Sequence, residues 1–287
     1  MRVGRVVEIW RYPVKSMGGE RLERCTLDAQ GIPGDRGWAV RDDAASEIRG
    51  AKKLPDLLRC TARYVEEPAE GCVPPAEITF PGGLRMWSDD PEVSGRVSAL
   101  VGRRVTLWPL RPAAELEHYR RGRPDDPDME RELRALFGLL DDEPLPDLSV
   151  FPPELFEFTS IPGTYFDALP LHLLTTATLA ELGRLNADSR FDRRRFRPNV
   201  LIEPERRDPG FVEGDWCGRT LAVGEARVAV EMPVVRCSMT THPQDDLPKD
   251  PGVLRTIVRH AAQQVGVYAR IASRGAVRLG DAVELVA

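Results

Sequence analysis

The sequence predicts a mainly β (α+β) protein, with an N-terminal β domain and a C-terminal β-barrel that carries peripheral helices. Short runs rich in β-branched residues, separated by Gly and Pro turns, recur through most of the 287 residues. These runs outnumber the stretches of helical periodicity and do not alternate with them regularly, which argues against a doubly wound parallel sheet. The length allows one large or two ordinary domains, each with its own core.

Residues 1–110 are predicted to form the first domain. Strand-like runs cover residues 3–10, 21–27, 37–41, 58–65, 78–80 and 105–108. Gly and Pro residues stand between the runs, as expected where a chain turns from one strand into the next. This region is therefore predicted to be a compact and mostly β unit.

Residues 111–166 differ from both flanking regions because they are rich in proline and acidic residues. Asp128 is a suitable N-cap for a helix. The apolar residues that follow it at helical spacing are Met129, Leu133, Leu136, Phe137 and Leu140. We expect a connector that wraps the surface and carries one short helix.

Residues 167–287 are predicted to form the barrel. A helix capped by Thr175 or Thr176 opens this region, and a second helix is expected between residues 252 and 265, where apolar residues line one face. Strand-like runs cover residues 199–202, 220–223, 227–232, 268–272 and 282–286. Strands therefore dominate here as well.

Charge and hydropathy argue against several classes of partner. The chain has 40 basic and 45 acidic residues and a net charge of −5, so its overall field does not favour nucleic acid or an anionic membrane. No run approaches the ~18 to 20 uncharged apolar residues of a membrane helix, and the first residues lack the apolar region of a secretory signal. We expect a cytoplasmic protein with no nucleic-acid partner and no membrane partner.

The five cysteines stand at positions 25, 60, 72, 217 and 237 and show no metal-knuckle spacing. They indicate separate thiols in a reducing compartment. No run of four cysteines suits an iron–sulfur cluster, so none is expected in this chain. Redox chemistry at this protein would therefore draw its electrons from another protein.

The signatures of common enzyme classes are absent from the sequence, among them the G-x-S-x-G elbow, the P-loop, H-E-x-x-H and a G-x-G-x-x-G leading into a helix. The chain is therefore not an obvious hydrolase, kinase or Rossmann dehydrogenase. Four clusters remain in which a basic residue, a small polar residue and a rigid Pro or Gly coincide.

Two of these clusters lie in the first domain and suit an anion. Lys15 and Ser16 end a strand and precede two glycines, so an ammonium group, a hydroxyl and backbone amides can face one phosphate. An exposed turn after an edge strand is the alternative. Arg36 lies between glycines, where its planar guanidinium can bind a phosphate or simply pair with Asp35.

The other two clusters lie in the second domain. Arg197 and Asn199 flank Pro198, and because they are two positions apart they are expected to point to the same side of an extended chain. This run is equally compatible with a solvated basic face. Arg236 precedes Cys237 after an apolar strand, and a thiolate beside an arginine suits a soft metal or a redox role. The alternative for Cys237 is a buried hydrophobic side chain.

The order of five segments along the chain resembles the MOSC family, which is named for the C-terminal domain of molybdenum cofactor sulfurase, in its two-part form with an N-terminal MOSC β-barrel domain. The segments are YPVKS, GDRGW, RFRPNVLIE, PVVRCSMTT and GVYARIASRGAVRLGDAVEL. The resemblance covers nearly the whole chain. It implies a MOSC N-terminal-like β domain over residues 1–110 and a MOSC β-barrel over residues 167–287.

The resemblance also implies a molybdenum cofactor of the molybdopterin type. Cys237 matches the cysteine that is the sulfur ligand of molybdenum, which makes it the implied metal ligand and catalytic residue. Lys15, Ser16 and Arg36 match the contacts to the pterin phosphate. The implied cofactor-binding residues are Lys15, Ser16, Arg36, Asp167, Arg197, Asn199, Arg236 and Tyr268. No lysine suits a Schiff base, and pyridoxal phosphate is not expected.

The activity that the resemblance implies is reduction of N-hydroxylated or N-oxidised small molecules by two-electron oxygen-atom transfer. Separate electron-donor proteins of ferredoxin, flavin or cytochrome type are expected to supply the electrons. One alternative is a carrier of the cofactor, or of a persulfide on Cys237, without turnover. Another is reduction of a different substrate, such as a sulfoxide, on the same cofactor. The fold alone does not choose between these functions.

Overall fold

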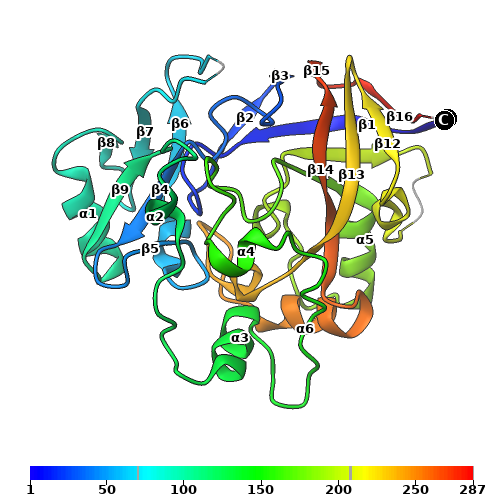
Figure 1. Cartoon of the computed structure of the whole chain (residues 1–287). Coiled ribbons are helices and arrows are strands. Elements are labelled where there is room, and N and C mark those ends of the chain that lie inside the picture. The colour runs from blue at the N-terminus through cyan, green and yellow to red at the C-terminus, as the bar shows by residue number, and fades with distance from the viewer. Residues whose placement is uncertain (70, 207–208, 287) are drawn as a thin grey trace.

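The computed structural model describes residues 1–69, 71–206 and 209–286 and shows two β-rich parts side by side (Figure 1). One part is a closed barrel, and the other consists of two small sheets with one helix. The predicted mainly β fold with peripheral helices is confirmed. In the part of the chain that is described, no helix is both long enough and apolar enough to span a membrane.

Seven strands close the barrel, because β11 pairs with both β10 and β1. The order around the barrel is β1 (Arg2–Arg11), β16 (Ala282–Leu285), β12 (Thr220–Val223), β13 (Ala226–Val235), β14 (Gln264–Ser273), β10 (Leu171–Thr175) and β11 (Val200–Pro204). Buried apolar side chains such as Val6, Leu173 and Val228 fill its interior. β2 (Glu20–Leu22) pairs antiparallel with the end of β1, and β3 (Arg24–Leu27) pairs with β15 (Gly275–Arg278).

The other part has a core of its own. One sheet has the order β5 (Glu47–Arg49), β4 (Trp38–Asp42) and β9 (Val105–Pro109), and the other has the order β6 (Thr61–Tyr64), β7 (Ala76–Thr79) and β8 (Arg85–Trp87). The helix α1 (Val93–Val101) packs on β9. Val40, Ile78 and Val97 are among the buried residues of this core.

β1 links the two cores. Val6 and Ile9 lie in the barrel core, whereas Val14 and Met17, only a few residues later, lie in the core of the other part. Lys15 and Ser16 are therefore held where the two parts meet.

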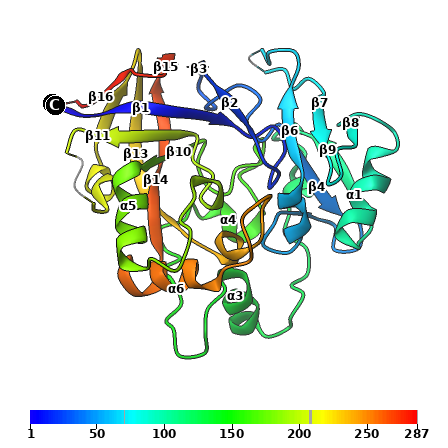
Figure 2. The ribbon, with the colours of Figure 1, turned by 180° about the vertical axis from the view of Figure 1, so that it is seen from behind.

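Helices cover the outside of the barrel. α5 (Thr176–Leu185) contacts β11, and α6 (Pro251–His260) contacts both α5 and β14 (Figure 2). Thr175 caps α5 by accepting a hydrogen bond from the Thr178 amide, as predicted. α6 ends five residues before the predicted 265, because Ala262 and Gln263 take positive φ values of 46° and 63° and turn the chain into β14. The 3₁₀ helices are η1 (Pro55–Arg59), η2 (Arg193–Arg195), η3 (Val212–Trp216) and η4 (Ser238–Thr241).

The connector carries α2 (Leu116–Tyr119), α3 (Met129–Phe137) and α4 (Glu154–Glu157). Asp128 caps α3 by accepting from the amides of Glu130 and Arg131, which confirms the predicted start of this helix. The C-terminal end of α3 then reaches the barrel, where the Leu136 carbonyl accepts a hydrogen bond from the Ser238 hydroxyl at 3.0 Å.

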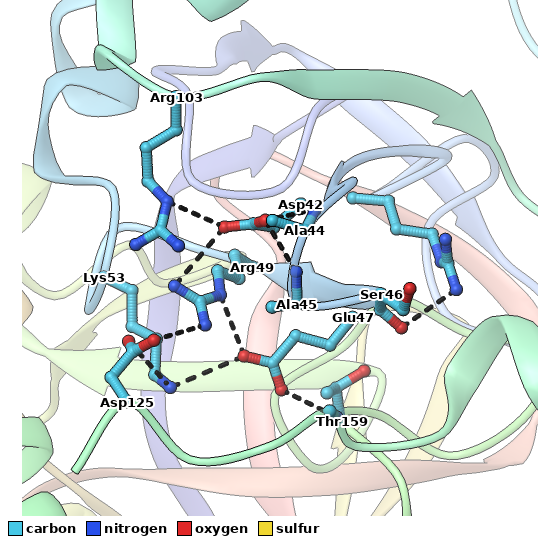
Figure 3. A network of polar contacts seen from close by, with 12 residues as sticks. Asp42, Ala44, Ala45, Ser46, Glu47, Arg49, Lys53, Arg103, Asp125 and Thr159 are labelled. Carbon is cyan, nitrogen blue, oxygen red and sulfur yellow. Dashed lines mark hydrogen bonds and ion pairs between the residues drawn. The ribbon is translucent and has the colours of Figure 1, made fainter.

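A partly buried group of charged side chains connects the connector to the N-terminal sheets (Figure 3). We call it the connector cluster. Arg49 donates to Asp125 at 2.7 Å and to Glu47 at 2.9 Å, and Lys53 pairs with Glu132 at 2.8 Å. The members of the cluster are Asp42, Glu47, Arg49, Lys53, Arg103, Asp125 and Glu132.

Four strands lie outside the predicted runs: β5, β8, β10 and β15. β10 is the most instructive, since every one of its five residues is buried. A short run that is buried throughout and leads directly into a helix carries no alternating pattern, so periodicity cannot distinguish it from the start of that helix.

Candidate functional site

Lys15 lies in the segment that follows β1, and its side chain points toward the loop that precedes β10. Its Nζ donates to the Tyr165 carbonyl at 2.7 Å and to Asp167 Oδ1 at 2.8 Å. Burial lowers the pKa of Lys15, although Asp167 opposes the effect. Burial would raise the pKa of Asp167, but Lys15, Lys52 and Arg36 hold it well below its usual range. Asp167 is thus a carboxylate that orients Lys15.

Ser16 and Arg36 both have left-handed backbones, with φ values of 69° and 51°. Ser16 Oγ accepts from the Ala51 amide at 2.8 Å, and a hydroxyl that accepts one hydrogen bond can still donate another. A Cβ at position 50 would lie 2.7 Å from this oxygen, so Gly50 allows the close approach. Arg36 donates to Asp35, the pairing considered from the sequence.

Arg36 and Arg197 lie on the same aromatic ring. Their guanidinium carbons are 4.6 Å and 4.2 Å from the centroid of Tyr12, a cation–π arrangement that brings the two like charges together. Burial and the Arg36 charge lower the pKa of Arg197 to about 10. Arg197 Nη1 donates to the Met17 carbonyl at 2.5 Å.

The expected extended geometry of Arg197 is wrong. Its φ is 57°, a left-handed conformation, so Arg197 and Asn199 do not share one side of an extended strand. Asn199 instead donates to Asp35 Oδ2 at 2.9 Å and to the Trp10 carbonyl at 3.2 Å. It therefore orients the carboxylate that holds Arg36.

Arg236 and Cys237 follow β13. Arg236 is buried and donates to the carbonyls of Val265 and Phe196. Burial lowers the pKa of Arg236 to about 10. Cys237 is 7% exposed, and its carbonyl accepts from Thr240 Oγ1 at 3.0 Å within η4.

Two residues of β10 and β14 complete the site. His172, which sequence reasoning missed, accepts a hydrogen bond at Nε2 from Arg236 at 2.7 Å. The Tyr268 ring lies 5.7 Å from the imidazole, and burial, with the Asp167 charge, raises the pKa of Tyr268. Nothing in the local sequence marks His172, because it stands in the apolar run LHLLT.

All eight predicted cofactor-binding residues and Cys237 thus gather where the barrel meets the N-terminal part. Arg236 binds His172, whose Nδ1 lies 3.2 Å from the Arg197 carbonyl, and Asp167 pairs with Lys15 and lies near Arg36. We call Lys15, Arg36, Arg197 and Arg236, with Asp35 and Asp167, the cationic cluster. Its four cations face two carboxylates.

The cationic cluster suits an anion. Among the residues that the structure describes, the hydrogen-bond acceptors of Arg197 and Arg236 are all uncharged. Buried cations without counter-charge are costly, and a phosphate with its several acceptor oxygens would satisfy them. No three His, Cys, Asp or Glu side chains within the described ranges are placed to hold a metal together.

A cavity of about 470 Å³ opens beside Arg36 and is bounded by both parts of the chain. Asp35, Arg36, Leu110, Tyr165 and Phe166 are among the residues that line it. Cys237 is not among its lining residues, so the cavity gives access to the Arg36 side of the site.

Two family models match this chain. The MOSC domain matches residues 163–284, and the MOSC N-terminal beta barrel domain matches residues 3–74. The chain contains both MOSC domains. Lys15, Ser16 and Arg36 lie within the N-terminal match, and the other predicted site residues lie within the MOSC domain. The two matched domains therefore meet at the cationic cluster.

Known proteins that are similar to this chain match it at low identity. Mitochondrial amidoxime-reducing component 1 of Mus musculus is 23% identical over 322 aligned residues, which cover 99% of this chain and 83% of the mouse protein. The YUAD protein from Bacillus subtilis has a TM-score of 0.45 and 12% identity, over 99% of this chain and 95% of that one. YiiM from Geobacillus stearothermophilus has a TM-score of 0.31 and 22% identity, over 41% and 54%.

Proposed function

We propose that this MOSC protein is an oxidoreductase that binds a molybdenum cofactor and reduces N-hydroxylated or N-oxidised small molecules. The observation that carries the proposal is the cationic cluster beside Cys237, in which four buried or largely buried cations face two carboxylates. The similarity to an amidoxime-reducing protein over nearly the whole chain supports the same reaction class.

The residues divide into three tasks. Lys15, Ser16 and Arg36 would bind the cofactor phosphate through an ammonium group, a hydroxyl and a guanidinium. Asp167 and Asn199 orient this set, because Asp167 holds Lys15 and Asn199 holds the Asp35 partner of Arg36. The two remaining arginines, Arg197 and Arg236, supply charge for the rest of the anion.

Cys237 would be the protein's sulfur ligand to the metal. When bound, the cofactor supplies a centre that accepts and donates two electrons together with an oxygen atom. In the overall reaction the N–O bond of the substrate breaks, and an N–H bond forms where the substrate is N-hydroxylated. The oxygen leaves as water, and two electrons and two protons are consumed. We propose that a separate protein of ferredoxin, flavin or cytochrome type delivers the electrons.

Residues of the chain also limit the access of water to Cys237 and hold a proton near it. Cys237 is buried, and α3 contacts the next residue through the Ser238 hydroxyl, which limits the access of water. Because the pKa of Tyr268 is raised, its Oη keeps its proton at neutral pH and can donate a hydrogen bond to a substrate oxygen.

The burial of Cys237 also bears on the carrier alternative. A protein that hands on a cofactor or a persulfide must present its sulfur to an acceptor protein. The contacts of α3 with Ser238 would have to open for that to happen. The closed arrangement supports turnover in place.

The test is the molybdenum and pterin content of the protein purified from a host that makes the cofactor. Wild type, Cys237→Ala and wild type from a cofactor-deficient host are compared, with Cys217→Ala as the matched cysteine control. We expect near-stoichiometric molybdenum in wild type and Cys217→Ala, and none in the other two. Reduction of an amidoxime or a hydroxylamine with an artificial electron donor is then measured. A folded protein without molybdenum in every sample would contradict the proposal and direct attention to a persulfide on Cys237.

A further inference from the structure

We propose that His172 is a positioning residue of the cationic cluster, a single imidazole that fixes Arg197 through its backbone carbonyl and Arg236 through its guanidinium. The inference rests on the proposed function, because it concerns the same site. Neither the sequence pattern nor the similarity to known proteins assigns a role to this residue.

The first step is the contact with Arg197. His172 is 3% exposed, and its Nδ1 lies 3.2 Å from the Arg197 carbonyl. The backbone of the same residue is bound to Asn199 on both sides: the His172 amide donates to Asn199 Oδ1 at 3.1 Å, and its carbonyl accepts from the Asn199 amide at 2.8 Å. These three hydrogen bonds hold the 197–199 segment against β10.

The left-handed backbone of Arg197 explains why such a hold is needed. A residue with a Cβ at a φ of 57° is strained, and it persists only where its surroundings fix it. The conformation also places the Arg197 side chain over Tyr12 and beside Arg36. His172 therefore helps to keep a conformation that brings two like charges together.

The second step is the contact with Arg236. An arginine only donates hydrogen bonds, so the Nε2 that lies 2.7 Å from Arg236 Nη2 must be the unprotonated nitrogen. The proton is then on Nδ1, which donates to the Arg197 carbonyl. The two contacts fix one tautomer of a neutral ring. Burial and the Arg236 charge, which lower the pKa of His172 well below its usual value, act in the same direction.

The neighbouring strand is shaped around this ring. A Cβ at position 266 would lie 2.4 Å from His172 Nε2, and Gly266 has a φ of 79°. Tyr268, which pairs with His172 across the two strands, packs its ring against the imidazole at 5.7 Å. The glycine and the tyrosine of β14 thus leave room for one orientation of the ring.

The chemical consequence concerns charge. A carboxylate in place of His172 would bind Arg236 more strongly but would cancel its charge. A neutral imidazole binds the guanidinium and leaves its positive charge for an anion. The groups that face the ring are Arg236 from the end of β13, Tyr268 from β14 and the Arg197 carbonyl, while Arg36 and Asp167 act from farther away.

The first experiment measures the tautomer of the ring in the unliganded wild-type protein by ¹⁵N NMR of labelled histidine. The sequence has only four histidines, and the His172→Gln spectrum identifies the signal of interest. We expect a neutral ring with its proton on Nδ1 that does not change between about pH 5.5 and 8. A ring that titrates near the ordinary histidine pKa, or carries its proton on Nε2, overturns the inference.

The second experiment measures the binding of pyrophosphate by calorimetry. We expect about 10-fold weaker binding in His172→Leu and partial recovery in His172→Gln, whose side-chain oxygen can accept from Arg236. Leu182→Ala, a buried variant of α5, is the control for lost stability and is expected to bind as wild type does.

The outcomes distinguish the role of His172 from the proposed function. If folded His172→Leu binds pyrophosphate as tightly as wild type, His172 is only a core residue and the inference is wrong. If wild type binds no pyrophosphate, the proposed function loses its support, while the NMR spectrum still decides whether the ring is fixed as described.

Discussion

This protein has two clusters of charged side chains, and they differ in the number of carboxylates available to each cation. In the connector cluster, Arg49 and Asp42 are both almost completely buried, yet three cations face four carboxylates and each cation has a carboxylate partner. In the cationic cluster, four cations face two carboxylates, and Arg197 and Arg236 bind uncharged acceptors. A balanced cluster joins parts of the structure, whereas an unbalanced one is suited to a ligand.

The pKa shifts show the same difference. Burial lowers the pKa of Arg49, but its bonds to Asp125 and its nearness to Glu47 and Asp42 more than offset this, and the pKa is raised. Burial lowers the pKa of Arg197 and Arg236 to about 10, and carboxylates do not offset it. Arg197 and Arg236 would therefore gain from a bound anion, whereas Arg49 would not.

The largest effect is expected for Arg49→Met. The change removes the closest counter-charge of the buried Glu47 and one of the two arginines that pair with Asp42, and it should lower the free energy of unfolding by about 3–5 kcal/mol. Arg197→Met removes a cation from an excess, so its cost should be clearly smaller. Urea unfolding of the two variants tests the difference. Equal losses would show that the two clusters stabilise the fold in the same way.

A smaller effect on the fold but a clear effect on the ligand is expected for Lys15→Met. Loss of one charged contact to phosphate should reduce cofactor affinity by about 10- to 100-fold while the unfolding midpoint stays close to that of wild type. Molybdenum and pterin content after dialysis is the measurement, and Lys53→Met, in the connector cluster, is the matched lysine control. Full cofactor occupancy in Lys15→Met would remove Lys15 from the phosphate site.

The smallest effect is expected for the pH dependence of stability, to which His118 contributes. Its Nε2 bonds the Tyr165 hydroxyl at 2.7 Å, and burial lowers its pKa to about 4. Between the ordinary value of about 6.5 and pH 4, the unfolded chain binds a proton that the folded protein does not, so stability falls as the pH falls.

His118→Phe keeps the aromatic contacts and removes this proton, so its stability should fall about 2 kcal/mol less than that of wild type between pH 7 and pH 5. Thermal unfolding at the two pH values measures it. His172, whose pKa is also lowered, keeps part of the slope in the variant. Identical slopes in both proteins would show that His118 titrates normally.

The sequence predicted which residues supply the chemistry of the site better than it predicted which residues hold them in place. Lys15, Arg36 and Cys237 stand beside glycines, a serine or an arginine, and those local patterns pointed to an anion and a metal. The partners that orient them come from distant segments. Tyr165 and Asp167 reach Lys15 from the connector side, and such long-range contacts leave no local pattern.

For the fold as well, local features could be predicted from the sequence and long-range pairings could not. The helix after Asp128 was predictable because its cap and its apolar spacing are local. The assignment of β1 to the barrel was not, because its pairing with β11 and β16 depends on residues near the other end of the sequence. Arg197 looked extended because proline usually favours that conformation in the residue before it. Tertiary contacts with His172 and Asn199 instead hold it in the left-handed region.

The pairing of β1 with β16 also sets an order of events during synthesis. The Met1 amino group donates to the Leu285 carbonyl, a contact between positions 284 residues apart. Contacts this distant form late, because the loop between them must be closed first. The small sheets that follow β1 can fold on the ribosome while β1 still waits for its neighbours. Lys15 becomes fixed only after its partners Tyr165 and Asp167 have emerged, so the site at the boundary of the two parts forms late in synthesis.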